Sequence, residues 1–217
     1  MRNIIIVVSL ALLAVGAFQY PSWHASRTQL AIAEDRVREV IEAGTNSVNF
    51  SDLPALRRLP ANIGDVPNLA YLTVRETSLS DLSGIEGINT LQHLDLNMTH
   101  VSDLAPLTGL PNLRLVQLHD TWIEDVSPLT TLPALERLDI GKTQIASLEP
   151  ITRIENLQWL NLYRSHALDG SRDHLETLDR IVFLDISGGT AYRDNYRPGW
   201  QFNFVLQLNR YRKRFGL

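Results

Sequence analysis

The sequence predicts an α/β solenoid, a fold in which similar short units stack side by side and share one continuous core. The first observation is that four consecutive blocks of 22 residues align without a gap over residues 67–154. The second is that apolar residues recur at the same positions of each block, so that each unit can bury its apolar side only against its neighbours. The third is that amphipathic segments flank the array, which predicts a helical cap at each end.

Residues 1–18 are expected to form a signal peptide or an N-terminal membrane anchor. Arg2 precedes an apolar run at 4–18, and Val15-Gly16-Ala17 fits the cleavage site of a secretory leader. A helix over this run would span ~23 Å, which is shorter than the ~30 Å hydrocarbon core and favours cleavage. On either interpretation the protein is extracytoplasmic: periplasmic, secreted, or anchored and facing outward.

A helix is predicted over residues 26–44 as the N-terminal cap. Ser26 and Gln29 have the spacing of a capping box at its start, and Gly44 is suited to end it. Five apolar residues fall on one face at helical spacing, namely Leu30, Ala33, Val37, Val40 and Ile41. Such a helix would cover the apolar end of the array, which would otherwise meet water.

The repeats are predicted over residues 45–188. An imperfect unit at 47–66 comes first, with Val48 and Phe50 in its strand, and the four regular blocks follow. A fifth unit at 155–178 loses the pattern after its strand. A last strand at 181–187 is followed by two glycines, which end the period.

Residues 189–217 are predicted to form a C-terminal helical cap. Its apolar residues recur at helical spacing, and its outer face is basic, with Arg210, Arg212, Lys213 and Arg214. We interpret the basic face as a solvated surface, because the chain carries a net charge of -4 and a secreted protein rarely meets nucleic acid. Contact with a membrane surface beside an uncleaved N-terminal segment is a weaker alternative.

Each block follows the order L-x-x-L-x-L-x-x-T-x-I-x-D-L-x-P-L-x-x-L. This order resembles the leucine-rich repeat family, in the short 22-residue class found in internalin-like bacterial proteins, and the resemblance covers about residues 45–187. It implies a horseshoe with a parallel β-sheet on its concave side, where the ligands of the family usually dock. This chain has a threonine where the family usually has asparagine, at Thr77, Thr99, Thr121 and Thr143.

The columns that make the repeat visible are interpreted as structural. The threonine hydroxyls are expected to bond the backbone of the next repeat, which would satisfy polar groups inside the turn. Prolines at 106, 128 and 150 leave room only for turns or short 3₁₀ pieces on the convex side. Asp81, Asp103 and Asp125 are expected to cap those turns.

Function is expected to lie in the outward-facing residues that vary from block to block, because exposed aromatic residues and arginine are typical of binding hot spots. We expect a protein partner to bind this concave face, with a carbohydrate or cell-envelope ligand and a purely structural scaffold as alternatives. An alternative for Trp159 and Phe183 is that the C-terminal cap covers them. The expected partner-binding residues lie in three rows across the strands: Tyr71, His93, Leu115, Arg137 and Trp159 in the first; Thr73, Asp95, Gln117, Asp139 and Asn161 in the second; and Arg75, Asn97, His119 and Tyr163 in the third.

No catalytic, metal or cofactor site is expected. The chain has no cysteine, and we find no nucleophile elbow, phosphate loop or zinc spacing in it. Strand geometry places His93 ~14 Å from His119, Asp95 ~10 Å from Asp139, and His119 ~8 Å from Asp139. These separations do not fit a metal site, and the last is long for a hydrogen bond without side-chain reach.

Overall fold

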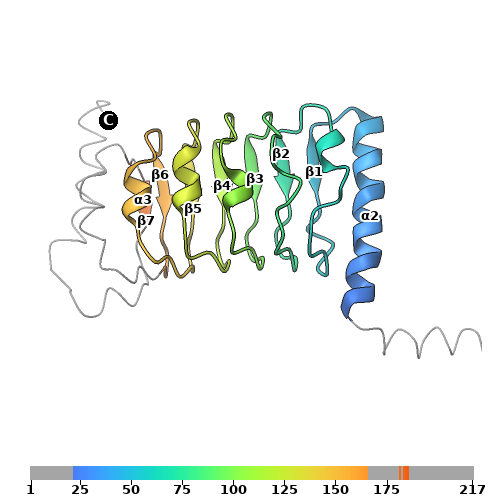
Figure 1. The fold of residues 1–217 in the computed structure, drawn as a ribbon, viewed down its shortest axis with the longest axis horizontal. Helices are drawn as coiled ribbons and strands as arrows, with labels where there is room; N and C mark the ends of the chain where they lie inside the picture. Colours follow the sequence, from blue (N-terminus) through green and yellow to red (C-terminus); the bar gives the residue numbers. More distant parts are fainter. Residues whose placement is uncertain (1–21, 166–180, 182, 186–217) are drawn as a thin grey trace, which may run out of the picture.

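The computed structural model describes residues 22–165, 181 and 183–185. It shows an open, parallel sheet of seven strands whose order in space is their order in the sequence. The strands stand side by side along the long axis of the molecule, and a long helix stands at the N-terminal end of the array (Figure 1). The predicted α/β solenoid with a helical N-terminal cap is therefore confirmed.

Every strand is three residues long, and neighbouring strands pair with the same residue of each repeat opposite its equivalent. The hydrogen-bond ladder continues past the strands: Met98 N–H donates to His119 O at 2.8 Å, and Asp120 N–H donates to Gly141 O at 2.9 Å. The strands are β1 (Ser47–Asn49), β2 (Tyr71–Thr73), β3 (His93–Asp95), β4 (Leu115–Gln117), β5 (Arg137–Asp139), β6 (Trp159–Asn161) and β7 (Phe183–Asp185).

The ladder is extended by one residue per repeat in the left-handed backbone region, although none of these residues is glycine. Their φ angles lie between 53° and 60°. A left-handed conformation costs roughly 1–2 kcal/mol for a residue with a side chain. In return, four of their N–H groups donate to the next repeat. The residues of this column are Glu76, Met98, Asp120, Lys142 and Arg164.

The side opposite the sheet consists of turns and short helices, as predicted. Proline lies in the first turn of η2 (Ala105–Leu107), η3 (Ser127–Thr131) and α3 (Glu149–Thr152), and a further 3₁₀ helix, η1, spans Ile63–Asp65. The expected aspartate caps are confirmed. The Oδ1 atoms of Asp81, Asp103 and Asp125 each accept the N–H of the residue two positions later, at 2.8–2.9 Å.

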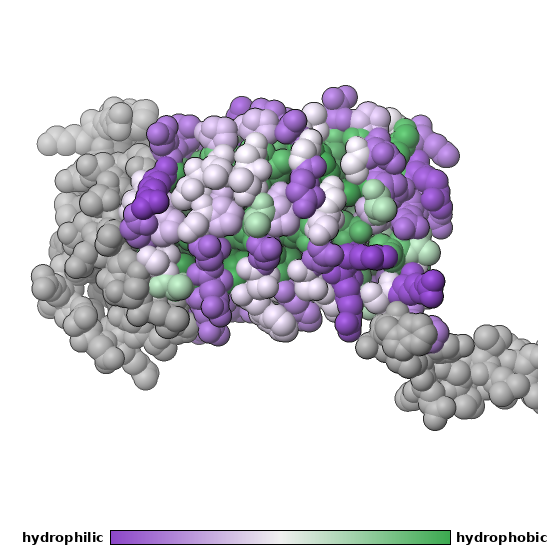
Figure 2. Space-filling model, in the orientation of Figure 1, coloured by the Kyte–Doolittle hydropathy of each residue, from purple (hydrophilic) through white to green (hydrophobic). Residues whose placement is uncertain are grey.

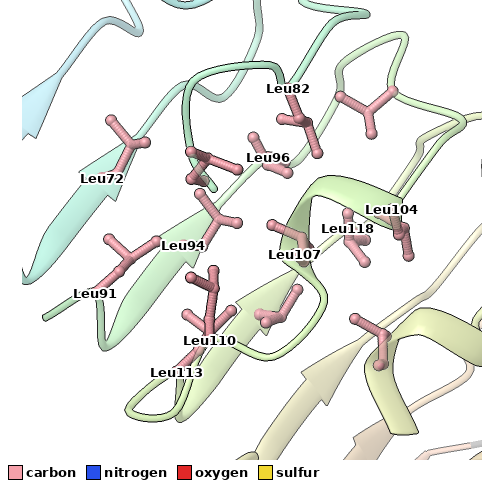
Figure 3. Close-up of a cluster of buried hydrophobic side chains, with 14 of the residues drawn as sticks. Leu72, Leu82, Leu91, Leu94, Leu96, Leu104, Leu107, Leu110, Leu113 and Leu118 are labelled. Carbon is pink, nitrogen blue, oxygen red and sulfur yellow. The ribbon is translucent and has the colours of Figure 1, made fainter. Parts of the chain in front are cut away.

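The core is a continuous column of aliphatic side chains between the sheet and the short helices. Leu94 of β3 points toward residues of the opposite wall such as Leu107 of η2 (Figure 3). Both side chains are fully buried or nearly so. From outside, hydrophilic and intermediate residues cover most of the face shown in Figure 2, and hydrophobic residues are visible between them. Stacking therefore uses the leucine positions of every repeat and leaves the outward positions free to vary.

The buried threonines correct one prediction. Their hydroxyls donate to the carbonyl three residues earlier in the same repeat, as in the bond of Thr99 Oγ1 to Leu96 O at 2.7 Å, and not to the next repeat. The physical reason is that the chain turns inward directly after the strand, which brings each threonine hydroxyl close to the carbonyl group three residues before it. Ser165 does bridge repeats, because its hydroxyl donates to Ile140 O at 2.5 Å.

The N-terminal cap is helix α2, which spans Ser22–Ala43 and so begins four residues before the predicted Ser26. The capping box was the wrong start signal, because the helix already includes the four residues before Ser26. Gly44 ends the helix as predicted, with φ at 65°. The N–H of Thr45 donates to Val40 O at 3.2 Å, which is the bond of a Schellman motif.

Helix α2 seals the end of the core. Ala33 and Val37 are fully buried against the first repeat. The guanidinium of Arg36 donates to both carboxylate oxygens of Asp52, at 2.5 and 2.8 Å, and to Asn49 O at 2.6 Å. The hydrogen bond from Arg36 lowers the pKa of Asp52 below its usual value. Apolar burial and a two-pronged ion pair thus fix the helix across the edge of β1.

Three predictions concern residues outside the described part: the segment at 1–18, the portion of the fifth repeat that follows Ser165, and the C-terminal cap at 189–217. Within the described part of the chain, no helix is both long and apolar enough to cross a membrane.

Candidate binding surface on the strand face

We define the strand face as the two outward-facing residues of each strand from β2 to β6, together with the residue two positions after the end of each of these strands. The register confirms the first predicted row, in which Tyr71, His93, Leu115, Arg137 and Trp159 stand opposite one another on adjacent strands. It also confirms the second row, which is Thr73, Asp95, Gln117, Asp139 and Asn161. Phe183 of β7 is in register with Trp159, and its side chain lies outside the described part.

The first row holds two ring contacts between neighbouring strands. The rings of Tyr71 and His93 meet edge to face, with their centroids 4.7 Å apart, and Tyr71 remains 41% exposed. The guanidinium carbon of Arg137 lies 5.4 Å from the centroid of the Trp159 ring. That distance permits a cation–π attraction, which restricts both side chains before any partner arrives.

A second cluster surrounds Gly141, at the carboxyl end of β5. A Cβ atom at Gly141 would lie only 2.5 Å from His119 Nδ1, so His119 occupies the space that a side chain would need. The side chains of His119 and Asp139 meet there, with His119 Nδ1 3.6 Å from Asp139 Oδ1, although strand spacing puts their backbones ~8 Å apart. Sequence spacing missed the contact because it fixes the Cα positions, and the glycine lets the imidazole lean across.

The same cluster extends to the next strand. The rings of His119 and Tyr163 are nearly parallel, at 13°, with centroids 6.5 Å apart. The guanidinium carbon of Arg164 lies 5.2 Å from the centroid of the Tyr163 ring. Aromatic, imidazole and guanidinium groups thus lie together over β4 to β6, which is the side-chain chemistry that binding hot spots favour.

Several expected binding residues are also used by the fold itself. The side-chain oxygens of Asp95, Asp139 and Asn161 accept the N–H two residues later, at 2.8–3.0 Å. Asn97 Oδ1 accepts the N–H of His119 in the next repeat, at 2.8 Å. These bonds hold the turn after each strand, so the second row has a structural role beside any role in binding.

The remaining members of the set differ in exposure. Arg75 is exposed and donates to the carboxylate of Glu76, at 2.7 Å from Nη2. Thr73, Leu115 and Gln117 are half-buried. The structure therefore gathers the strongest binding candidates at the two ring contacts of the first row, Tyr71 with His93 and Arg137 with Trp159, and around Gly141.

No protein-family model and no curated protein matches the sequence. Solved structures do match, among them an internalin (InlF) of Listeria monocytogenes at 21% identity and a TM-score of 0.51, covering 66% of this chain and 53% of that one. Internalin C2 of the same organism is 23% identical with a TM-score of 0.51, over 70% of this chain and 62% of that one.

A leucine-rich repeat protein of Leptospira interrogans is 21% identical with a TM-score of 0.54, over 64% of this chain and 39% of that one. This chain has the leucine-rich repeat fold. It spans less than two thirds of the length of each of these three structures. At these identities the likeness concerns the fold, and the strand face of this leucine-rich repeat chain has to be interpreted from its own residues.

Asp95 is a residue of the strand face whose pKa is shifted by its surroundings. Burial raises the pKa of Asp95 above its usual value, and the hydrogen bond from Asn97 N–H opposes that shift only in part. Folding therefore disfavours the ionised form of this carboxyl group. As pH rises through the unfolded pKa of about 3.9 and then through the higher folded pKa, this group withdraws stability.

Replacing Asp95 with asparagine should raise the free energy of unfolding at pH 7 by up to about 1 kcal/mol, since the site is only partly shielded from water. Asparagine can still accept the Asn97 N–H, as Asn161 does for Tyr163 N–H in the equivalent leucine-rich repeat. Urea unfolding at pH 3 and pH 7 tests this: the gain should be present at pH 7 and absent at pH 3. Asp103→Asn, at an exposed turn, is the control, and an equal gain there would contradict the explanation.

Metal binding finds no support in the side-chain geometry. Within residues 22–165 and the described part of β7, no group of three or more histidine and acidic side chains could hold a metal ion. The contact of His119 with Asp139 has no third ligand in that region. Its neighbours, Tyr163 and Arg164, bring an aromatic ring and a guanidinium group and add no carboxylate or imidazole ligand.

Sequence reasoning missed one exposed apolar group away from the strand face. Trp122 is 65% exposed and Met98 is 45% exposed. Each is next to a residue of the buried threonine column, and neither position belongs to the repeating pattern on which the sequence interpretation rested. The available signal was Trp122 itself, a large aromatic residue between two positions that the repeat assigns to the interior.

Proposed function

We propose that this chain is a non-catalytic protein-interaction module that acts outside the cytoplasm and binds its partner through the strand face. The observation that carries the proposal is the row of ring and guanidinium contacts across β2 to β6. The leucine column behind the sheet already meets the needs of stacking. The outward pairs are therefore not required by the fold and present large, partly restrained side chains to solvent.

A protein partner is favoured over a carbohydrate by the arginines. Sugar rings bind by stacking on open aromatic faces, whereas Arg137 lies over the Trp159 ring and Arg164 lies over the Tyr163 ring. Guanidinium groups held in this way can donate to carboxylate and carbonyl oxygens of a polypeptide. The nearby Asp139 and Asp95 add acceptors, so the surface offers both signs of charge to a mixed protein surface.

The extracytoplasmic location rests on the hydrophobic segment at 4–18, with Arg2 before it. Cell fractionation and the mass of the mature N-terminus test this part separately. Recovery in the periplasm, in the medium or in the membrane facing outward is expected, and cytoplasmic recovery of the intact chain would contradict it.

A photo-crosslinking experiment tests the binding surface. A benzoylphenylalanine placed at Gln117, in the middle of the strand face, should capture a partner from an envelope extract, whereas one placed at Thr130 on η3 should not. The double variant Tyr71→Ala/Trp159→Ala should weaken binding of the identified partner by at least about a hundredfold, as expected for two hot-spot residues.

The matched control for the double variant is Arg153→Ala, which removes an exposed side chain of the opposite side. It should bind the partner like the wild type. Capture only from Thr130, or unchanged affinity of the double variant, would show that the strand face is not the binding surface.

A further inference from the structure

Trp122 marks a second surface, at the rim where the carboxyl ends of the strands turn toward the short helices. Its neighbours in the chain, Thr121 and Ile123, are buried, so the alternation of the backbone turns the indole outward. The N–H of Trp122 donates to Val101 O at 3.0 Å, which ties this segment to the preceding repeat. Trp122 is 65% exposed, whereas tryptophan is highly buried on average in folded proteins.

The indole is held in place by its neighbours. His100, at the equivalent position of the preceding repeat, stacks on Trp122 with ring centroids 4.4 Å apart and planes at 23°. His100 N–H donates to Leu79 O at 2.8 Å, so its own segment is also fixed. Met98 stands two residues before His100 and is 45% exposed. The rim therefore presents an ordered aromatic plate, the stacked rings of His100 and Trp122, and an exposed, flexible thioether two residues before His100 in the chain.

Two exposed carboxylates lie close to Trp122 in the chain. Asp120 is two residues before it and Glu124 is two residues after it, and the intervening Thr121 and Ile123 are buried. Asp120 already attracts one ammonium group, because Lys142 Nζ lies 3.4 Å from its Oδ2. Glu124 forms no ion pair among the described residues. Acidic groups beside an indole are complementary to a cation and opposed to an anion.

We propose that Met98, His100, Asp120, Trp122 and Glu124, here called the rim patch, form a second interaction surface that binds a polypeptide segment carrying arginine or lysine. The cationic head lies over the open part of the indole and against Glu124, while its methylene stem covers Met98. The rim patch shares no residue with the strand face. One protein could therefore engage a mixed surface with the strand face and a basic segment with the rim.

The test uses the full chain and a short model peptide, acetyl-Gly-Arg-Gly-Arg-Gly-amide, followed by the indole N–H and backbone amide resonances in a ¹H–¹⁵N spectrum. The Arg peptide should shift the Trp122 indole and the Glu124 amide. The same peptide with citrulline in place of arginine, which keeps the shape and removes the charge, should bind at least about tenfold more weakly.

Variants separate the two surfaces. Trp122→Ala should reduce the peptide affinity by about tenfold or more, measured on the Glu124 amide, and Asp120→Asn/Glu124→Gln should weaken binding and its salt dependence. Trp159→Ala, on the strand face, should leave the titration unchanged, so failure of the strand-face proposal does not affect this result. Thermal unfolding of Trp122→Ala should match the wild type, because the side chain is largely exposed.

Three outcomes would overturn the proposal. The first is equal binding of the arginine and citrulline peptides. The second is undiminished binding to Trp122→Ala. The third is a shift of the Trp122 indole by a chito-oligosaccharide at lower concentration than by the arginine peptide, which would identify the plate as a sugar-binding surface.

Discussion

Replacing Ala33 with aspartate should lower the free energy of unfolding by at least about 4 kcal/mol, while the same substitution at Ala31 should cost less than about 1 kcal/mol. Ala33 is fully buried where α2 meets the first repeat, and Ala31 is exposed on the other side of the helix. A carboxylate at position 33 would be buried without a partner or would force the helix off the core. The matched pair separates burial from helix propensity, because both changes are Ala→Asp.

Urea unfolding followed by circular dichroism measures the difference, and hydrogen exchange locates it. Each repeat gains stability from its neighbours, so loss of the cap should raise exchange most in β1 and β2 and least in β5 and β6. Equal costs at the two positions would show that α2 does not act as the seal of the array. Uniform exchange along the sheet would instead show that the array unfolds as one unit.

Replacing Thr99 with valine should cost about 1–3 kcal/mol, although the two side chains have nearly the same shape. Thr99 is 1% exposed, and its hydroxyl donates to Leu96 O at 2.7 Å. Valine would leave that carbonyl group in the core without this donor, and the cost arises from the desolvated carbonyl and not from a cavity. The other threonines of the column make the same bond, so Thr121→Val should behave similarly.

The control for Thr99→Val is Thr108→Val, the same change at an exposed position of the same repeat. It should alter the free energy of unfolding by less than about 0.5 kcal/mol. Chemical denaturation of both variants gives the comparison. If Thr99→Val proved as stable as Thr108→Val, the hydroxyl would contribute no net stability, and the column would be explained by shape alone.

Much of the fold follows from repetition in the sequence. A period of 22 residues fixes which residues are equivalent, and in a parallel stack equivalent residues must lie opposite one another. For that reason the row from Tyr71 to Trp159 was predicted correctly, residue by residue. The capping role of the turn aspartates could be predicted equally well from the sequence, because an Asx turn depends only on residues two positions apart.

The rest depends on side-chain reach, which a period does not encode. The contact of His119 with Asp139 exists because Gly141 leaves room for the imidazole, and the threonine bond depends on how sharply the chain turns after the strand. The start of α2 was misplaced because a capping box is a local signal that a continuing helix can override. Trp122 was overlooked because its exposure follows from the burial of both neighbours in the chain.

The uniform pairing from β2 to β6 bears on how such a surface can change between generations. Loss of residues 89–110 by recombination would bring Leu115 beside Tyr71 and leave every backbone partner an equivalent one. Three outward side chains of the strand face and two residues of the rim patch would disappear together, while the leucines behind them would close up as before. Whole repeats can therefore be removed or duplicated, which changes the exposed surface while the sheet and the leucine core keep the same arrangement.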